Sequence, residues 1–267
     1  MKVTFPYMGT TLIYTKLFEM LGHEVIVPIK PNKETIDLGV KYSPEFACFP
    51  LKVLMGTYLQ SIKRGAETVI TSGGHGPCRA GYYGEVHKKT LEHMGKDIDF
   101  IVFDEPSRGY RAFFDKIKRV KGNTSWPGAA KIIKTIYQMA HSLDKLEKYL
   151  TSRRAYVKDF IGFNKAWEEI QNKYLGIENS GDIKLLEKEA LETMKNFEAV
   201  IPPEKERIRI GIIGEIYVVM EPSVNNNIEE ILNEFGVEVE RSQYISEWID
   251  ENLIPFKNKK TKEIMKK

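Results

Sequence analysis

The sequence predicts an α/β protein with a Rossmann-like parallel-sheet lobe, a helical middle region, and a second, incomplete Rossmann-like lobe. Three observations predict this architecture. Near the N-terminus, short strand-like segments alternate with segments of helical length. The middle of the chain has apolar residues at helical spacing and no strand-like run. After Pro202 and Pro203, the strand–helix–strand plan of the N-terminus returns.

The first lobe is predicted to span residues 1–106. Its predicted strands are 3–5, 24–28, 68–71 and 100–103, and its predicted helices are 11–21, 51–64 and 83–94. Each predicted helix has apolar residues three or four positions apart and is followed by a glycine, which is a common helix stop. Strands that alternate with helices of this length predict a mainly parallel sheet covered on both faces.

The remainder divides into a helical region, 107–203, and a partial lobe, 204–267. The predicted elements are helices 129–150 and 183–197 in the former, and strand 209–213, helix 227–235 and strand 237–240 in the latter. Two strands and a helix or two cannot bury both faces of a sheet, so this lobe is marginal alone. Two explanations stay open: another polypeptide completes the lobe, or the gene is split or truncated.

Composition excludes several classes of protein. The chain has 267 residues, with 40 Lys and Arg against 37 Asp and Glu. The basic excess gathers in the C-terminal NKKTKEIMKK, which lacks interleaved aromatic residues, so we expect no nucleic-acid partner. No apolar run approaches the roughly 20 residues that span a bilayer, and the N-terminus does not resemble a signal sequence. We therefore expect a cytoplasmic protein that does not interact with membranes.

The chain has two cysteines, which are too few for a disulfide framework. Each cysteine lies in a distinctive segment. Cys48 lies in SPEFACFPLK, directly before a predicted helix, with Pro50 suited to the first helical turn. Cys78 lies in GGHGPCRAGYYGE, between a predicted strand and a predicted helix. Both thiols are therefore expected at the carboxyl edge of a parallel sheet, where open α/β proteins bind their ligands.

This location suits a metal centre, because the positive end of a helix favours the thiolate form that metals require. Arg79 adds positive charge, and the glycines expose backbone amide groups to a ligand. The candidate metal ligands are Cys48, Cys78 and His75; the candidate cofactor-contacting residues are Gly74, Gly76, Arg79 and Tyr82. Spacing alone leaves two interpretations open, a thiolate metal site or a glycine-rich turn with two incidental thiols.

A resemblance favours the first interpretation. SPEFACFPLK, GGHGPCRAGYYGEV and GEIYVVMEPSVNNNIEEILNEFGVEVERSQYISEW together resemble the acyl-CoA dehydratase activase-related proteins. These belong to the superfamily of 2-hydroxyacyl-CoA dehydratases, benzoyl-CoA reductases and double-cubane cluster proteins. The resemblance implies a [4Fe–4S] or double-cubane iron–sulfur cluster with Cys48 and Cys78 as ligands. It also implies an acyl-CoA substrate and an ATP-dependent activator protein as partner, consistent with the lack of a phosphate-binding loop in this chain.

The sequence departs from this family in two respects. Relatives often have cysteine where His75 stands, and they extend further, with another cysteine in the second lobe. Two thiolates are too few for a cluster, so the remaining ligands are expected from His75, a second subunit, a homodimer or a separately encoded C-terminal half.

Three hypotheses for the function follow. The first is an iron–sulfur component that transfers low-potential electrons or acts on CoA thioesters with a partner. The second is a non-catalytic scaffold subunit without its own cluster. The third is a mononuclear zinc hydrolase that uses Cys48, His75 and Cys78. Whether the chain is itself an enzyme stays open, and no catalytic residue is assigned.

Overall fold

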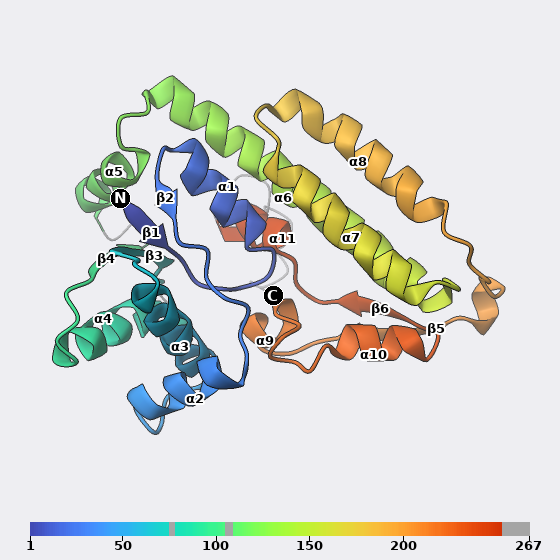
Figure 1. Cartoon of the computed structure of the whole chain (residues 1–267), viewed down its shortest axis with the longest axis horizontal. Helices are drawn as coiled ribbons and strands as arrows, with labels where there is room; N and C mark the ends of the chain where they lie inside the picture. The colour runs from blue at the N-terminus through green and yellow to red at the C-terminus, as the bar shows by residue number, and fades with distance from the viewer. Residues whose placement is uncertain (75–77, 105–108, 253–267) are drawn as a thin grey trace, which may run out of the picture. The chain divides into compact units, whose positions relative to one another are not determined.

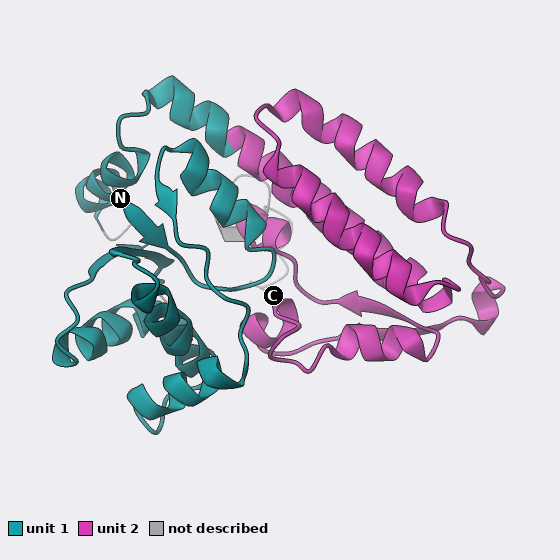
Figure 2. Ribbon diagram, in the orientation of Figure 1, with its two compact units in different colours: residues 1–133 teal, residues 134–267 magenta. Residues whose placement is uncertain are grey.

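The computed structural model describes residues 1–74, 78–104 and 109–252 (Figure 1). The chain divides into two compact units, 1–133 and 134–267 (Figure 2). The predicted α/β fold class is confirmed, because a parallel four-stranded sheet is combined with many helices. The predicted three-part division of the chain stays a prediction.

Unit 1 is built on a parallel sheet with the strand order β2-β1-β3-β4. Its strands are β1 (Lys2–Thr4), β2 (Glu24–Val25), β3 (Thr68–Ser72) and β4 (Asp99–Phe103). Its helices are α1 (Leu12–Met20), α2 (Lys33–Tyr42), α3 (Phe49–Lys63), η1 (Arg79–Tyr82), α4 (Tyr83–His93) and α5 (Tyr110–Lys121). This strand order is one of the two common orders of doubly wound proteins, whose ligands bind at the carboxyl ends of the strands.

Both faces of this sheet are covered. On one face, Tyr58 of α3 contacts Phe100 of β4 and His87 of α4 through edge-on ring contacts. Phe113 of α5 packs on Phe103, whose side chain lies on the opposite face of β4 because neighbouring positions alternate. Burial on both sides explains why the central strand β3 reads as an almost uninterrupted buried segment.

Helix α2 was not predicted from the sequence. Its apolar residues Ile36, Leu38 and Val40 alternate instead of following helical spacing, and Gly39 interrupts them. A capping box formed by Asn32 and Thr35 begins the helix. Close packing on α3 then supplies the stabilisation that local propensity lacks.

Unit 2 contains a layer of long helices and a two-stranded parallel sheet. Helix α6 (Trp126–Arg153) includes the boundary between the units; α7 (Phe160–Leu175) and α8 (Ser180–Lys195) follow it, with short turns η3 (Arg154–Tyr156) and η4 (Glu204–Glu206). The sheet consists of β5 (Ile208–Ile212) and β6 (Val237–Arg241), with helices α9 (Ile216–Met220), α10 (Ile228–Glu234) and α11 (Ile245–Asn252). None of the helices in the described residues is both long and apolar enough to cross a membrane.

Buried charges connect the helices of unit 2 to its sheet. Arg241, at the carboxyl end of β6, forms ion pairs with Glu147 of α6 and Glu229 of α10. Burial of the Arg241 guanidinium lowers its pKa, but the two carboxylates outweigh burial and the net pKa is raised. Removing either carboxylate would leave a buried charge poorly compensated, which is strongly destabilising.

Candidate functional site

Both cysteines directly precede helices at the carboxyl edge of the unit 1 sheet, as the sequence predicts. Cys48 is the residue before α3, and Pro50 lies in the first turn of that helix. Cys78 is the residue before η1, which leads directly into α4. Cys48 is half-buried and Cys78 is exposed, and both are free thiols. The two sulfur atoms are therefore placed beside helix N-termini, which favour negative charge.

Two contacts bring the cysteine segments together. The Tyr83 hydroxyl lies 2.6 Å from the Cys48 Sγ, within hydrogen-bonding distance. The Arg79 guanidinium donates a hydrogen bond of 3.5 Å to the backbone carbonyl of Phe46. Since Arg79 and Tyr83 follow Cys78, while Phe46 precedes Cys48, the segments are joined by two independent contacts. The structure therefore places the two motifs in one local site.

Of the other predicted site residues, some have described positions and some do not. Tyr82 is exposed, at 62% of its surface, and no cap hydrogen bond forms from its side chain. Gly74 lies beside Gly81, close to the turn that contains Cys78. His75 and Gly76 lie outside the described residues, so their roles stay predictions.

The glycines of the second segment have a packing role within this unit. A Cβ atom on Gly81 would lie 2.5 Å from the Gly74 carbonyl oxygen, and one on Gly84 would lie 2.7 Å from Val102. Glycine is therefore required for η1 and α4 to approach their neighbours closely. These two positions are explained by protein packing, without reference to a ligand.

His87, on α4, is buried and serves as a structural residue. Its Nε2 donates a hydrogen bond of 2.9 Å to the Leu51 carbonyl of α3, while its Nδ1 is buried and has no hydrogen-bond partner among the described residues. Burial lowers the pKa of His87 to about 4. The imidazole is therefore neutral near pH 7, and its hydrogen bond to the Leu51 carbonyl connects α4 to α3.

The described metal-ligand side chains near the two cysteines are too few for the cluster that the resemblance implies. Within the described residues, no group of three or more His, Cys, Asp or Glu side chains is arranged to hold a metal ion. The structure contains two free cysteines, whereas a [4Fe–4S] cluster ordinarily uses four. Two cysteines are fewer than these four, so Cys48 and Cys78 alone do not complete such a cluster.

Sequence reasoning missed an open pocket beside the Cys48 segment. The pocket has a volume of about 610 Å³ and lies between the end of α2 and the second half of α4. Its lining consists of Lys41, Tyr42, Ser43, Pro44, Val86, Lys89, Thr90, His93 and Met94. Lys41 and Lys89 form no ion pair with any residue in the described ranges, and the buried Ser43 Oγ has no hydrogen-bond partner there. These lysines are spaced like ordinary solvent-exposed helix residues, so no local signal marks them.

The N-terminal part of the chain matches a protein-family model. Residues 2–71, which are 70 of the 267 residues, match the protein-family model described as the CoA enzyme activase uncharacterised domain. A search of curated proteins found no match. The matched segment runs from β1 into β3, so it includes Cys48 and ends before Cys78. The N-terminal part of the chain is therefore similar to a CoA enzyme activase-related domain.

Proposed function

We propose that the chain is an iron–sulfur component of a CoA enzyme system, in which Cys48 and Cys78 supply two thiolate ligands and another chain supplies the rest. The observation that carries this proposal is the junction of the two cysteine segments at one sheet edge. The similarity of residues 2–71 to an activase-related domain supports the connection to CoA enzymes. An ATP-dependent activator is the proposed electron-donating partner.

Particular residues of this chain would perform particular tasks. Cys48 and Cys78 would hold the cluster, which when bound supplies low-potential electron transfer. Tyr83 would donate its hydroxyl proton in a hydrogen bond to the Cys48 thiolate, since a thiolate can only accept. Such hydrogen bonds to ligating sulfur adjust the reduction potential of iron–sulfur centres. Arg79 would hold the Cys78 turn against the Cys48 segment.

Iron and acid-labile sulfide test the proposal when they are measured in this chain purified without oxygen from its native host, together with the chains that remain bound to it. We expect iron and sulfide in equal amounts in the wild type, and at least a tenfold loss of both in Cys48→Ala and Cys78→Ala. Glu45→Gln is the matched control, because Glu45 is an exposed acid three positions from Cys48 and should leave the iron content unchanged. Iron-free wild-type protein, or variants that retain iron, would contradict the proposal. Zinc without sulfide would favour the zinc hydrolase.

A non-catalytic scaffold is the second candidate. The observation in its favour is that the sequence contains two cysteines, fewer than the four that a [4Fe–4S] cluster ordinarily uses. A scaffold would dock to an activator, or to a separately encoded half, with both cysteines dispensable. Full complementation by a Cys48→Ala/Cys78→Ala double variant in cells would favour this candidate over the iron–sulfur component.

The pocket beside the Cys48 segment supports an acyl-CoA as the ligand of this system. CoA carries several phosphates, and Lys41, Lys89 and His93 provide basic groups around a mostly apolar pocket. Lys41 also lies over the ring of Tyr42, at 5.1 Å from its centroid. We propose that the phosphates contact these lysines.

Calorimetric titration with an acyl-CoA tests this assignment. A Lys41→Ala/Lys89→Ala double variant should bind at least tenfold more weakly, because two charge-assisted contacts to phosphate are lost. Lys33→Ala is the control, because Lys33 lies on the same helix, outside the pocket lining, and pairs with Asp37. Equal affinities of the wild type and the double variant would exclude this pocket as the site.

A further inference from the structure

Strand β5 lies at the edge of the two-stranded sheet of unit 2, and most of its residues are exposed. Ile208 is 61% exposed and Ile210 is 37% exposed, whereas their partners on β6, Val237 and Val239, are buried. No strand among the described residues pairs with the other side of β5. The strand also contains no lysine, proline or bulge, the usual devices that prevent edge-to-edge association.

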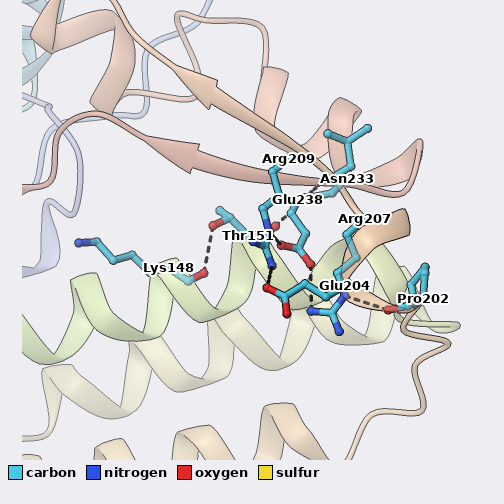
Figure 3. A network of polar contacts seen from close by, with 9 residues as sticks. Lys148, Thr151, Pro202, Glu204, Arg207, Arg209, Asn233 and Glu238 are labelled. Carbon is cyan, nitrogen blue, oxygen red and sulfur yellow. Dashed lines mark hydrogen bonds and ion pairs between the residues drawn. The ribbon is translucent and has the colours of Figure 1, made fainter.

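The two faces of the β5–β6 sheet differ in character. On one face, Arg209 and Arg207 pair with Glu238, and Arg209 also pairs with Glu204 (Figure 3). Side chains alternate along a strand, so Ile208 and Ile210 lie on the opposite face. Arg241 of β6 lies on that same apolar face and pairs with Glu229 of α10. Helix α10 therefore covers the part of this face that β6 forms. The isoleucines of β5 thus continue the α10-covered face, where their side chains are exposed.

Helix α10 displays a second exposed apolar group. Ile228, Ile231 and Phe235 are 40%, 45% and 78% exposed. Their spacing of three and four residues places them on one stripe of the helix surface. Unit 2 therefore exposes apolar residues both on its edge strand β5 and on α10, the helix that packs on the neighbouring strand β6.

The hydrogen-bonding pattern determines which residues of β5 offer free backbone groups. Ile212 accepts a hydrogen bond from the Ser242 amide, so its backbone faces the β6 side. Backbone groups alternate in direction along a strand, so Ile208 and Ile210 also face β6. Arg209 and Gly211 consequently present their amide and carbonyl groups at the free edge.

We infer that two copies of this chain associate through β5, in an antiparallel pairing centred on Ile210. About this centre, Arg209 of one copy faces Gly211 of the other, and these two residues exchange both of their edge hydrogen bonds. Ile208 faces Ile212, and Ile210 faces its own counterpart. No like charges oppose each other, whereas a centre on Arg209 would place two arginines face to face.

Symmetry supports this register. A two-fold axis perpendicular to the sheet relates identical surfaces, as in most homodimers. The axis keeps both α10 helices, and the isoleucines of both copies, on one face. Two marginal two-stranded sheets become a continuous four-stranded sheet.

Disulfide trapping tests the register directly. Ile210 and its counterpart form a non-hydrogen-bonded pair, with Cα atoms about 4.5 Å apart, within the range that a disulfide bridges. In a Cys48→Ser/Cys78→Ser background, Ile210→Cys should give a covalent dimer under mild oxidation. Ile208→Cys, whose opposite residue is Ile212, should cross-link at least tenfold more slowly. Equal rates for the two variants, or no cross-link at Ile210, would overturn this register.

Oligomeric state tests the dimer independently. Light scattering after size exclusion should show a dimer for the wild type and a monomer with an unchanged circular dichroism spectrum for Ile210→Lys. Ile161→Lys is the matched control, because Ile161 is 82% exposed on α7 of the same unit. A monomeric wild type, or a dimer that persists in Ile210→Lys, would overturn the proposal. Because the cross-linking variants lack both native cysteines, dimer formation and iron binding are tested separately.

Discussion

At the scale of single residues, His87 is the clearest titratable group with a structural task. Its ring donates to the Leu51 carbonyl through Nε2, and the buried Nδ1 has no acceptor for a second proton among the described residues. Protonation therefore places a charge in an apolar site between α3 and α4. This explains why burial lowers the pKa of His87 to about 4.

The sign of the resulting pH dependence follows from the lowered pKa. In the unfolded chain, His87 takes up a proton as the pH falls below its ordinary pKa of about 6.5. In the folded chain, His87 takes up this proton only near pH 4. The contribution of neutral His87 to the free energy of unfolding is thus complete above pH 6.5, and it is lost as the pH falls through 4. The loss amounts to about 3 kcal/mol.

We predict that His87→Gln reduces this acid sensitivity. The glutamine amide can still donate to the Leu51 carbonyl, but it does not titrate. The difference in unfolding free energy between pH 7 and pH 4 should shrink by about 3 kcal/mol relative to the wild type. Urea denaturation at a series of pH values measures this, with His93→Gln as a control because His93 is largely solvent-exposed. Parallel pH profiles for the wild type and His87→Gln would refute the assignment.

The Cys48–Tyr83 contact shows the limit of sequence reasoning at this scale. Each residue is predictable as a neighbour of a helix start, since a proline or a glycine-rich turn marks both places. Their pairing spans 35 positions along the chain and depends on the packing of α4 beside α3. His75 lies outside the described residues, so its role as a third ligand stays a prediction.

At the scale of elements, the crossing of α2 and α3 depends on two glycines. A Cβ atom on Gly56 would lie 1.9 Å from the Thr35 carbonyl oxygen, and one on Gly39 would lie 1.8 Å from the Lys52 carbonyl oxygen. Both contacts are with backbone, which cannot rotate away as a side chain can. The helices therefore cross at a separation that only glycine permits.

We predict that Gly56→Ala destabilises unit 1. The added methyl group forces α2 away from α3, and overpacking of this kind costs about 1–3 kcal/mol or more. Gly181→Ala is the matched control, since Gly181 also lies in a helix, α8, and a Cβ there meets no atom within 4 Å. Alanine has the higher helix propensity, so the control should be neutral or slightly stabilising. Thermal denaturation that ranked the two variants equally would contradict this account.

At the scale of the whole molecule, each unit has its own sheet and its own buried core. In unit 1, four strands are covered on both faces, so the sheet is complete in itself. In unit 2, β6 is buried while β5 is exposed along most of its length. This asymmetry underlies the proposed pairing of β5 between two copies, whereas the incompleteness of the second lobe stays a prediction.

The sequence by itself determined the order and type of most elements. Strand-like runs alternate with amphipathic helices, and helix ends coincide with glycines of positive φ such as Gly22, Gly65, Gly95 and Gly236. These signals are local, because periodicity and left-handed backbone conformations act over a few residues. The position of both cysteines before helices follows from the same signals.

Only the tertiary structure decided which of these segments meet. Helix α2, the Tyr83–Cys48 contact, and the ion pairs of Arg241 all depend on residues far apart in the chain. Local periodicity carries no information about such partners, since burial and close packing arise only when whole elements dock. The sequence therefore placed two thiols at helix starts, and the packing of α4 against α3 joined their segments into one candidate site.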